Sequence, residues 1–151
     1  MNKKIKELLF NHCKKQIESR LFKYNTRDKE LYESLNSETK SSAGDKHETG
    51  RGMLQLEREK IGNQIKRIEK EYELLAKIKI NFSSSTIILG SVIETKKNQY
   101  YMSFSAEPLI FNTNKYYCIS SKSPIGLLLY GKKKGDFFDF NQNKIKILDV
   151  Y

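Results

Sequence analysis

The chain has 151 residues, of which 38% are hydrophobic and 30% are charged. This length fits one ordinary domain or two small ones, and the apolar share is low for a single compact core, so we expect an elongated element with much charged surface. The net charge of +10 is spread along the chain. Such a charge favours contact with nucleic acid or an acidic partner, but it equally describes a solvated lysine-rich surface.

The sequence offers no membrane or secretion signal. No apolar stretch approaches the roughly 20 residues that a membrane-spanning helix needs. The apolar run after Met1 is too short for a signal peptide. Cys13 and Cys118 are far apart, match no metal-ligand spacing and occur in apolar patterns, so we predict buried free thiols in a reducing, cytoplasmic protein with no membrane partner.

The first half of the chain predicts two helices. Residues 3–35 contain neither proline nor glycine, and residues 53–80 form a second run with helical spacing. In both runs, seam residues recur at steps of three and four, which is a heptad pattern. The seam positions are 17, 21, 24, 28, 31 and 35 in the first run, and 54, 58, 61, 65, 68, 72 and 75 in the second.

One seam on each helix predicts an antiparallel hairpin, because each apolar stripe needs a partner and the other helix is the nearest one. The seams each contain one charged residue, Asp28 and Arg58. In the antiparallel register these two fall about one turn apart, and a mutual ion pair is the simplest way to accommodate both charges. The same register brings Ile17 to Tyr72 and Leu35 to Leu54.

A polar, Ser- and Gly-rich stretch at residues 34–52 predicts the turn between the helices. It contains Asp45 and Glu48, which project from one face of the first turn if the second helix begins near Gly44. Asp45 could be an N-terminal cap with Glu48 as its companion, since the helix dipole favours both. Alternatively, the two carboxylates are Mg²⁺ ligands whose site a partner completes. His47 between them is interpreted as solvated surface.

From Ser85 onward the pattern changes to the period of two that is typical of strands. Strands are expected at residues 86–95, 99–106, 116–120, 136–140 and 144–150. Ser123 is predicted to cap a short helix, with Pro124 at its first position and Gly131 at its end. The expected fold is therefore α+β, with a helical hairpin at residues 1–80, its tip near 39–52, and a small α+β domain at 81–151.

Four segments together resemble the Gre-type bacterial transcript cleavage factors, the GreA/GreB family of elongation factors. They are GDKHE at 44–48, LGSVIET at 89–95, SPIGLLLYGKKKGD at 123–136 and KIKILDV at 144–150. In this order and spacing they cover nearly the whole chain. The sequence departs from the family at 49–52, where TGRG stands in place of Asn-Ala-Glu-Tyr. For residues 81–151 the resemblance implies an FK506-binding-protein-like (FKBP-like) fold.

The resemblance implies a monomeric transcription elongation factor that binds bacterial RNA polymerase through its secondary channel, in complexes that also bind DNA. Asp45 and Glu48 would be the catalytic pair and help place a Mg²⁺ ion shared with the polymerase active site. This would stimulate cleavage of backtracked nascent RNA by the polymerase, so the protein would not be an enzyme alone. Lys46 and Arg51 would lie close to RNA phosphates.

Ser123, Pro124 and Ile125 correspond to the family's polymerase-docking motif, although a Ser-Pro pair can also simply start a helix. Because the tip departs from the family at 49–52, a second hypothesis stays open: a secondary-channel regulator of RNA polymerase that does not promote cleavage. A third hypothesis is a general coiled-coil interaction module.

Overall fold

The computed structural model describes residues 2–39 and 44–151, apart from the side chains of residues 38, 39 and 44–47. Helices α1 (Asn2–Thr39) and α2 (Gly44–Ala76) form a hairpin that is followed by a mixed sheet, so the predicted α+β class is confirmed. Two compact units result, Ile17–Glu73 and a unit made of Met1–Gln16 with Leu74–Tyr151. No helix within the described ranges is both long and apolar enough to cross a membrane.

Both helices extend further toward the turn than the sequence predicted. α1 continues to Thr39, and α2 begins at Gly44, the alternative start that the acidic pair suggested, but it ends at Ala76 and not at Ile80. Gly50 and Gly52 therefore lie inside α2. A glycine in an exposed part of a helix costs about 1 kcal/mol relative to alanine, and the continuous hydrogen bonds of an already nucleated helix can offset this cost. Neither Gly50 nor Gly52 has any atom within 4 Å of an added Cβ, so no close contact requires glycine there.

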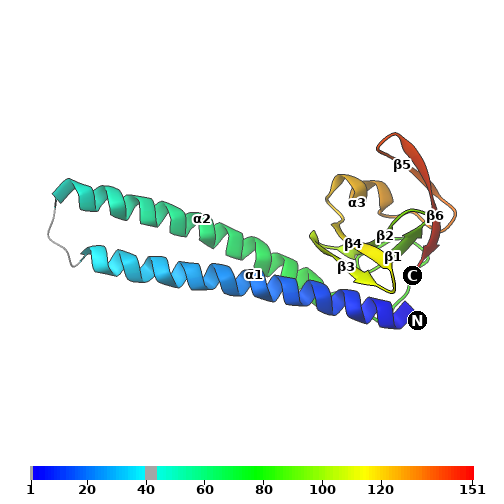
Figure 1. Cartoon of the computed structure of the whole chain (residues 1–151), viewed down its shortest axis with the longest axis horizontal. Helices are drawn as coiled ribbons and strands as arrows, with labels where there is room; N and C mark the ends of the chain where they lie inside the picture. Colours follow the sequence, from blue (N-terminus) through cyan, green and yellow to red (C-terminus); the bar gives the residue numbers. More distant parts are fainter. Residues whose placement is uncertain (1, 40–43) are drawn as a thin grey trace. The chain divides into compact units, whose positions relative to one another are not determined.

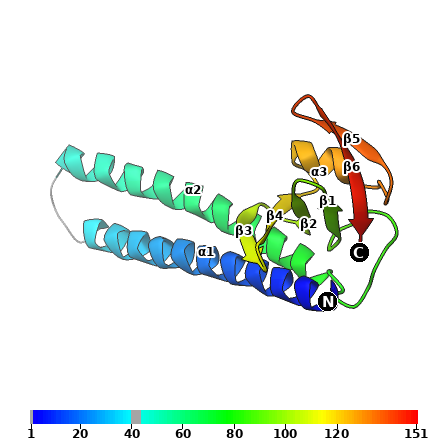
Figure 2. The ribbon, with the colours of Figure 1, turned by 45° about the vertical axis from the view of Figure 1, so that its right-hand side comes forward.

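The hairpin buries the predicted seam. Arg58 Nε donates to Asp28 Oδ1 at 3.0 Å, which confirms the predicted pair of seam charges. Two more pairs between the helices, Arg20 with Glu71 at 3.1 Å and Arg27 with Glu57 at 2.8 Å, maintain the antiparallel register, and the helices run side by side in Figures 1 and 2. The buried seam residues are Ile17, Leu31, Leu35, Ile61, Ile68 and Leu75. Tyr72 differs from the buried apolar residues of the seam, because it is 40% exposed.

We predict that the Asp28–Arg58 pair contributes modestly to hairpin stability. The side chains are 32% and 40% exposed, so a double-mutant cycle of Asp28→Ala and Arg58→Ala should give a coupling of about 0.5–1 kcal/mol in urea unfolding. Arg58→Ala alone should cost more than Asp28→Ala, because the guanidinium also lies 4.8 Å from the centre of the Tyr32 ring. High salt should reduce the coupling, and a coupling of zero at low salt would contradict the assignment.

The second unit contains one six-stranded sheet with the order β3-β4-β2-β1-β6-β5. Its strands are β1 (Val92–Thr95), β2 (Gln99–Ser103), β3 (Ala106–Phe111), β4 (Asn114–Ser120), β5 (Phe137–Phe140) and β6 (Asn143–Val150). β2 and β4 are parallel, and the other neighbours are antiparallel. The β5–β6 hairpin lies beside the short helix α3 (Pro124–Leu129) in Figure 2.

Two parts of the sheet differ from the prediction. Strand β3 was not expected, because its sequence contains Pro108; the sheet tolerates this proline because β3 is an edge strand with an irregular register. Residues 86–91 were expected to be strand but precede β1 as a loop. Gly90 adopts a φ of +89° there, and an added Cβ would lie 2.8 Å from Ile78 Cγ2, so this position turns the chain and needs glycine.

The short helix α3 packs on one face of the sheet. The buried core on this side includes Ile87, Ile93, Tyr100, Met102, Ile119, Leu129, Phe138 and Ile147. Successive side chains of a strand alternate between faces, so Tyr101 of β2 and Cys118 of β4, which are register partners, point to the opposite face. Burial of these large apolar groups on both faces is the main stabilising contribution to this unit.

The opposite face of the sheet is covered by the first turns of α1. Gln16 accepts from the backbone N–H of Glu107 at 2.8 Å, and His12 Nε2 lies 2.6 Å from the Glu107 carbonyl oxygen. These contacts satisfy backbone groups at the irregular part of β3. Cys13 and Cys118 are both buried and free, as the sequence predicted.

Candidate functional site

The first turn of α2 contains the predicted acidic pair. Because α2 begins at Gly44, Asp45 and Glu48 occupy its second and fifth residues, and a spacing of three residues places them on one side of the helix. Glu48 is exposed, whereas the side chains of Asp45 and Lys46 lie outside the described part of the chain.

The acidic pair can supply only part of a metal site. Mg²⁺ prefers six oxygen ligands and is commonly held by one or two carboxylates, with water and phosphate oxygens completing its shell. Among the described residues, no group of three or more His, Cys, Asp or Glu side chains could hold a metal ion. Asp45 and Glu48 could supply at most two carboxylate ligands to such an ion.

Arg51 follows on the same side of α2, three residues after Glu48. Its side chain is half-buried, and it has a glycine on each side, Gly50 and Gly52. The charge at this position is positive, in contrast to the acidic residue that the resemblance leads one to expect. A cation one turn beyond two carboxylates is suited to a phosphate group lying along the helix.

The flanks of the hairpin expose apolar side chains that the sequence analysis missed. Phe22, Met53 and Leu56 are 74%, 69% and 53% exposed. They border two open grooves of about 490 and 540 Å³, one including Phe22 and Arg27, the other including Met53, Leu56 and Glu57. All three side chains lie outside the heptad positions. Their spacing could therefore have identified them as exposed residues and not as part of the buried seam.

The predicted docking motif begins α3. Ser123 Oγ accepts from the Gly126 N–H at 3.1 Å and donates to the Ser120 carbonyl oxygen at 2.6 Å, so the predicted N-cap is confirmed. Pro124 is exposed at the first helical position. Ile125 is half-buried against the core. Of the three residues, Pro124 thus offers the most surface to a partner, while Ser123 and Ile125 have clear structural roles.

The exposed face of α3 is broader than the motif suggests. Leu127 and Tyr130 are 68% and 53% exposed, and a spacing of three residues aligns them with Pro124 along one side. The sequence analysis missed both residues. The signal was available, since the run PIGLLLY contains more large apolar residues than one face of a single short helix can bury.

We predict that Gly126→Ala strongly destabilises the second unit. An added Cβ would lie 1.9 Å from the Ser120 carbonyl oxygen, so α3 must shift from β4 at a cost of about 1–3 kcal/mol or more. Ser123→Ala should cost about 1 kcal/mol through loss of the cap. Thermal unfolding checks both changes. Gly50→Ala, in open helix, is the matched control and should be neutral or stabilising.

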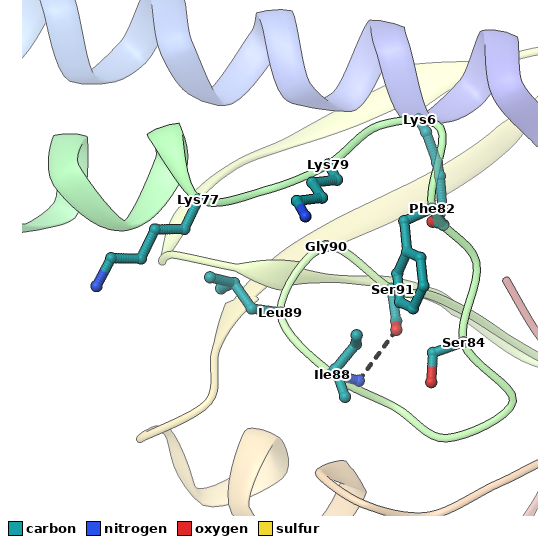
Figure 3. Close-up of a pocket in the computed structure, with 9 residues that line it drawn as sticks. All are labelled: Lys6, Lys77, Lys79, Phe82, Ser84, Ile88, Leu89, Gly90 and Ser91. Carbon is teal, nitrogen blue, oxygen red and sulfur yellow. Dashed lines mark hydrogen bonds between the residues drawn. The ribbon is translucent and has the colours of Figure 1, made fainter.

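A separate pocket of about 200 Å³ lies in the second unit (Figure 3). Lys6, Lys77 and Lys79 line it, and Lys77 extends away from the other labelled side chains in Figure 3. Lys6 Nζ donates to the Phe82 carbonyl oxygen at 2.8 Å, and burial lowers the pKa of this lysine. That bond ties the loop after α2 to α1, and the pocket contains none of the predicted site residues.

The sequence matches no protein-family model, and no curated protein matches it either. Among solved structures, it is similar to GreA factor homolog 1 (Gfh1) of Thermus thermophilus, with 21% identity, a TM-score of 0.36, and coverage of 91% of this chain and 93% of that one. A second structure, of the transcription factor Gfh1, has 22% identity and a TM-score of 0.35, with coverage of 91% and 92%. These values are too low to assign this chain a family or a function, and the fold class rests on its own helices and strands.

Proposed function

We propose that this protein is a transcription elongation factor that binds bacterial RNA polymerase through its secondary channel and stimulates cleavage of backtracked RNA. The observation that carries the proposal is the position of Asp45 and Glu48. They lie in the first turn of α2, where the two helices of the hairpin are joined. The segments at 44–48, 89–95, 123–136 and 144–150 support the proposal through their resemblance to Gre-type factors.

The chemistry follows from the two carboxylates. Mg²⁺, when bound together with polymerase ligands, supplies an activated water and stabilises charge at the phosphate. Asp45 and Glu48 contribute oxygen ligands from one side of α2 and orient the water. Arg51 and Lys46 contact phosphates of the extruded RNA. With the metal in place, such a water would be positioned to hydrolyse a phosphodiester bond near the RNA 3′ end.

The exposed apolar side chains have a natural place in this proposal. Phe22, Met53 and Leu56 on the hairpin would contact the walls of the channel. Pro124 and Leu127 on α3, with Tyr130 directly after it, would contact the polymerase surface. Exposed apolar groups suit a protein partner better than nucleic acid, since they gain free energy only when another surface covers them.

The second candidate is a secondary-channel regulator that does not promote cleavage. The specific observation in its favour is Arg51, which places a positive charge on the side of α2 that carries the acidic pair. In such a protein, the hairpin would occupy the channel and alter metal occupancy without positioning a water.

We predict that Asp45→Ala or Glu48→Ala abolishes stimulated RNA cleavage and leaves polymerase binding nearly intact. Loss of one ligand of the activating metal should lower the cleavage rate on the order of a hundredfold, as loss of other positioned charge-stabilising groups does. Asp45→Asn should fail almost as badly, because the negative ligand is removed. The measurement is gel analysis of labelled RNA in a stalled, backtracked elongation complex.

Glu59→Ala, an exposed acidic change further along α2, is the matched control and should cleave at the wild-type rate. Cleavage that survives both tip substitutions would reduce Asp45 and Glu48 to structural residues. Uncut RNA with the wild-type protein, together with altered transcription, would favour the regulator instead.

We predict that docking depends on the exposed side of α3. Pro124→Ala combined with Leu127→Ser should weaken polymerase binding at least tenfold in a competition assay, because both side chains are exposed and lie on one side of the helix. Lys122→Ala, also exposed, is the control for a nearby change outside that side. Circular dichroism should be unchanged for both variants. Wild-type affinity in the double variant would assign the motif a purely structural role.

A further inference from the structure

The two cysteines of the chain meet in the second unit. Cys13 lies on α1 and Cys118 on β4, yet their sulfur atoms are 3.7 Å apart. Their exposed fractions are 1% and 6%. Ser103 Oγ lies 3.4 Å from the Cys13 sulfur, and Tyr101, the register partner of Cys118, is buried beside them. Local sequence patterns could not predict this contact, because 105 positions separate the two cysteines.

The distance between the sulfurs corresponds to van der Waals contact. A disulfide bond has a length of about 2.0 Å. The two sulfur atoms must therefore approach each other by about 1.7 Å, through small side-chain rotations and a slight shift of α1. Hydrogen bonding with Cys118 lowers the pKa of the Cys13 thiol, and Ser103 adds to this while burial opposes it. The same contact raises the pKa of Cys118. The two thiols share one hydrogen bond, so loss of the first proton is a property of the pair.

We propose that Cys13 and Cys118 form a redox-modification site, which a peroxide closes to an intramolecular disulfide and a low-molecular-weight thiol reopens. The Cys13 thiolate attacks one oxygen of hydrogen peroxide and the O–O bond breaks. The departing hydroxide takes up a proton and becomes water. The resulting sulfenic acid on Cys13 is then attacked by the Cys118 sulfur, which releases a second water and forms the S–S bond. Two thiols lose two electrons, and the peroxide is reduced to two waters.

The bond would attach the N-terminal part of α1 covalently to β4, the strand next to the β3 edge of the sheet. In the reduced protein, this segment is retained by apolar packing and by polar contacts such as those of His12 and Gln16 with Glu107. Peroxide reaches the thiols only when the segment opens locally, so oxidation should be slower than that of an exposed cysteine. Once formed, the bond prevents that opening, because it removes freedom from the unfolded chain and from partly open states.

The experiment treats the full-length protein with hydrogen peroxide under native conditions. Intact mass, titration of free thiols and non-reducing electrophoresis then report the products. We expect a monomer lighter by the mass of two hydrogen atoms, no free thiols, and a rise in Tm that dithiothreitol reverses. Peptide mapping should join the segment around Cys13 to that around Cys118. The comparison protein is a Cys13→Ala, Cys118→Ala variant with Ser83→Cys, whose single thiol is exposed.

Each other outcome would overturn the proposal. If wild-type thiols stay reduced under native conditions, even after prolonged exposure to peroxide doses that fully oxidise the same protein unfolded in urea, the pair is inert core. If the disulfide forms only in urea, the folded geometry does not support it. Disulfide-linked dimers, or sulfinic acid in place of the internal bond, would show that the two sulfurs do not react with each other. Wild-type protein alone decides these points, so a variant that folds poorly does not affect them.

Discussion

Each long helix of this protein has one stripe of side chains to bury, and that stripe repeats at steps of three and four. Two such helices joined by a short connection can satisfy both stripes only by lying antiparallel. Arg58 and Asp28, bonded at 3.0 Å within the seam, help exclude a shifted register, since any slip would leave two half-buried charges without partners. The register in turn places the first turn of α2 at the joined end of the hairpin.

Elements governed by local pattern were predictable from the sequence. The two seams, the Ser123 cap and the β5–β6 hairpin follow from residue spacing and turn chemistry, which act over a few positions. Strand β3 was missed because Pro108 is normally unfavourable in a strand, and only pairing with β4 at the sheet edge reveals that its missing N–H is tolerated. Residues 86–91 have strand-like composition, but the chain turns at Gly90, which packs so closely against Ile78 that no side chain fits. This contact joins residues that are not neighbours in the sequence.

In the candidate site, too, the features set by local spacing were predictable, and those set by tertiary packing were not. The spacing of Asp45 and Glu48 depends only on where α2 begins, so the sequence could place them on one side of a first turn. Which residues around α3 are exposed depends on which side of the helix packs against the core, and this was not predicted from the sequence. Ile125 faces the core, while Leu127 and Tyr130 are exposed. The contact between Cys13 and Cys118 depends on the docking of α1 on β4, which no local pattern encodes.

Arg51 is the residue on which the two candidate functions differ most, and its effect depends on the surroundings of the tip. In water, a pair of opposite charges three residues apart on a helix is worth only about 0.2–0.5 kcal/mol. Arg51 is therefore a weak competitor for the carboxylate of Glu48 when a divalent cation is available. In a channel that excludes water, the guanidinium has a stronger partner in the RNA phosphates, and its binding to them would leave Glu48 free for the metal. Under the proposed cleavage function, an oriented water at the metal would depend on Asp45 and Glu48 rather than on the sign of the charge at position 51.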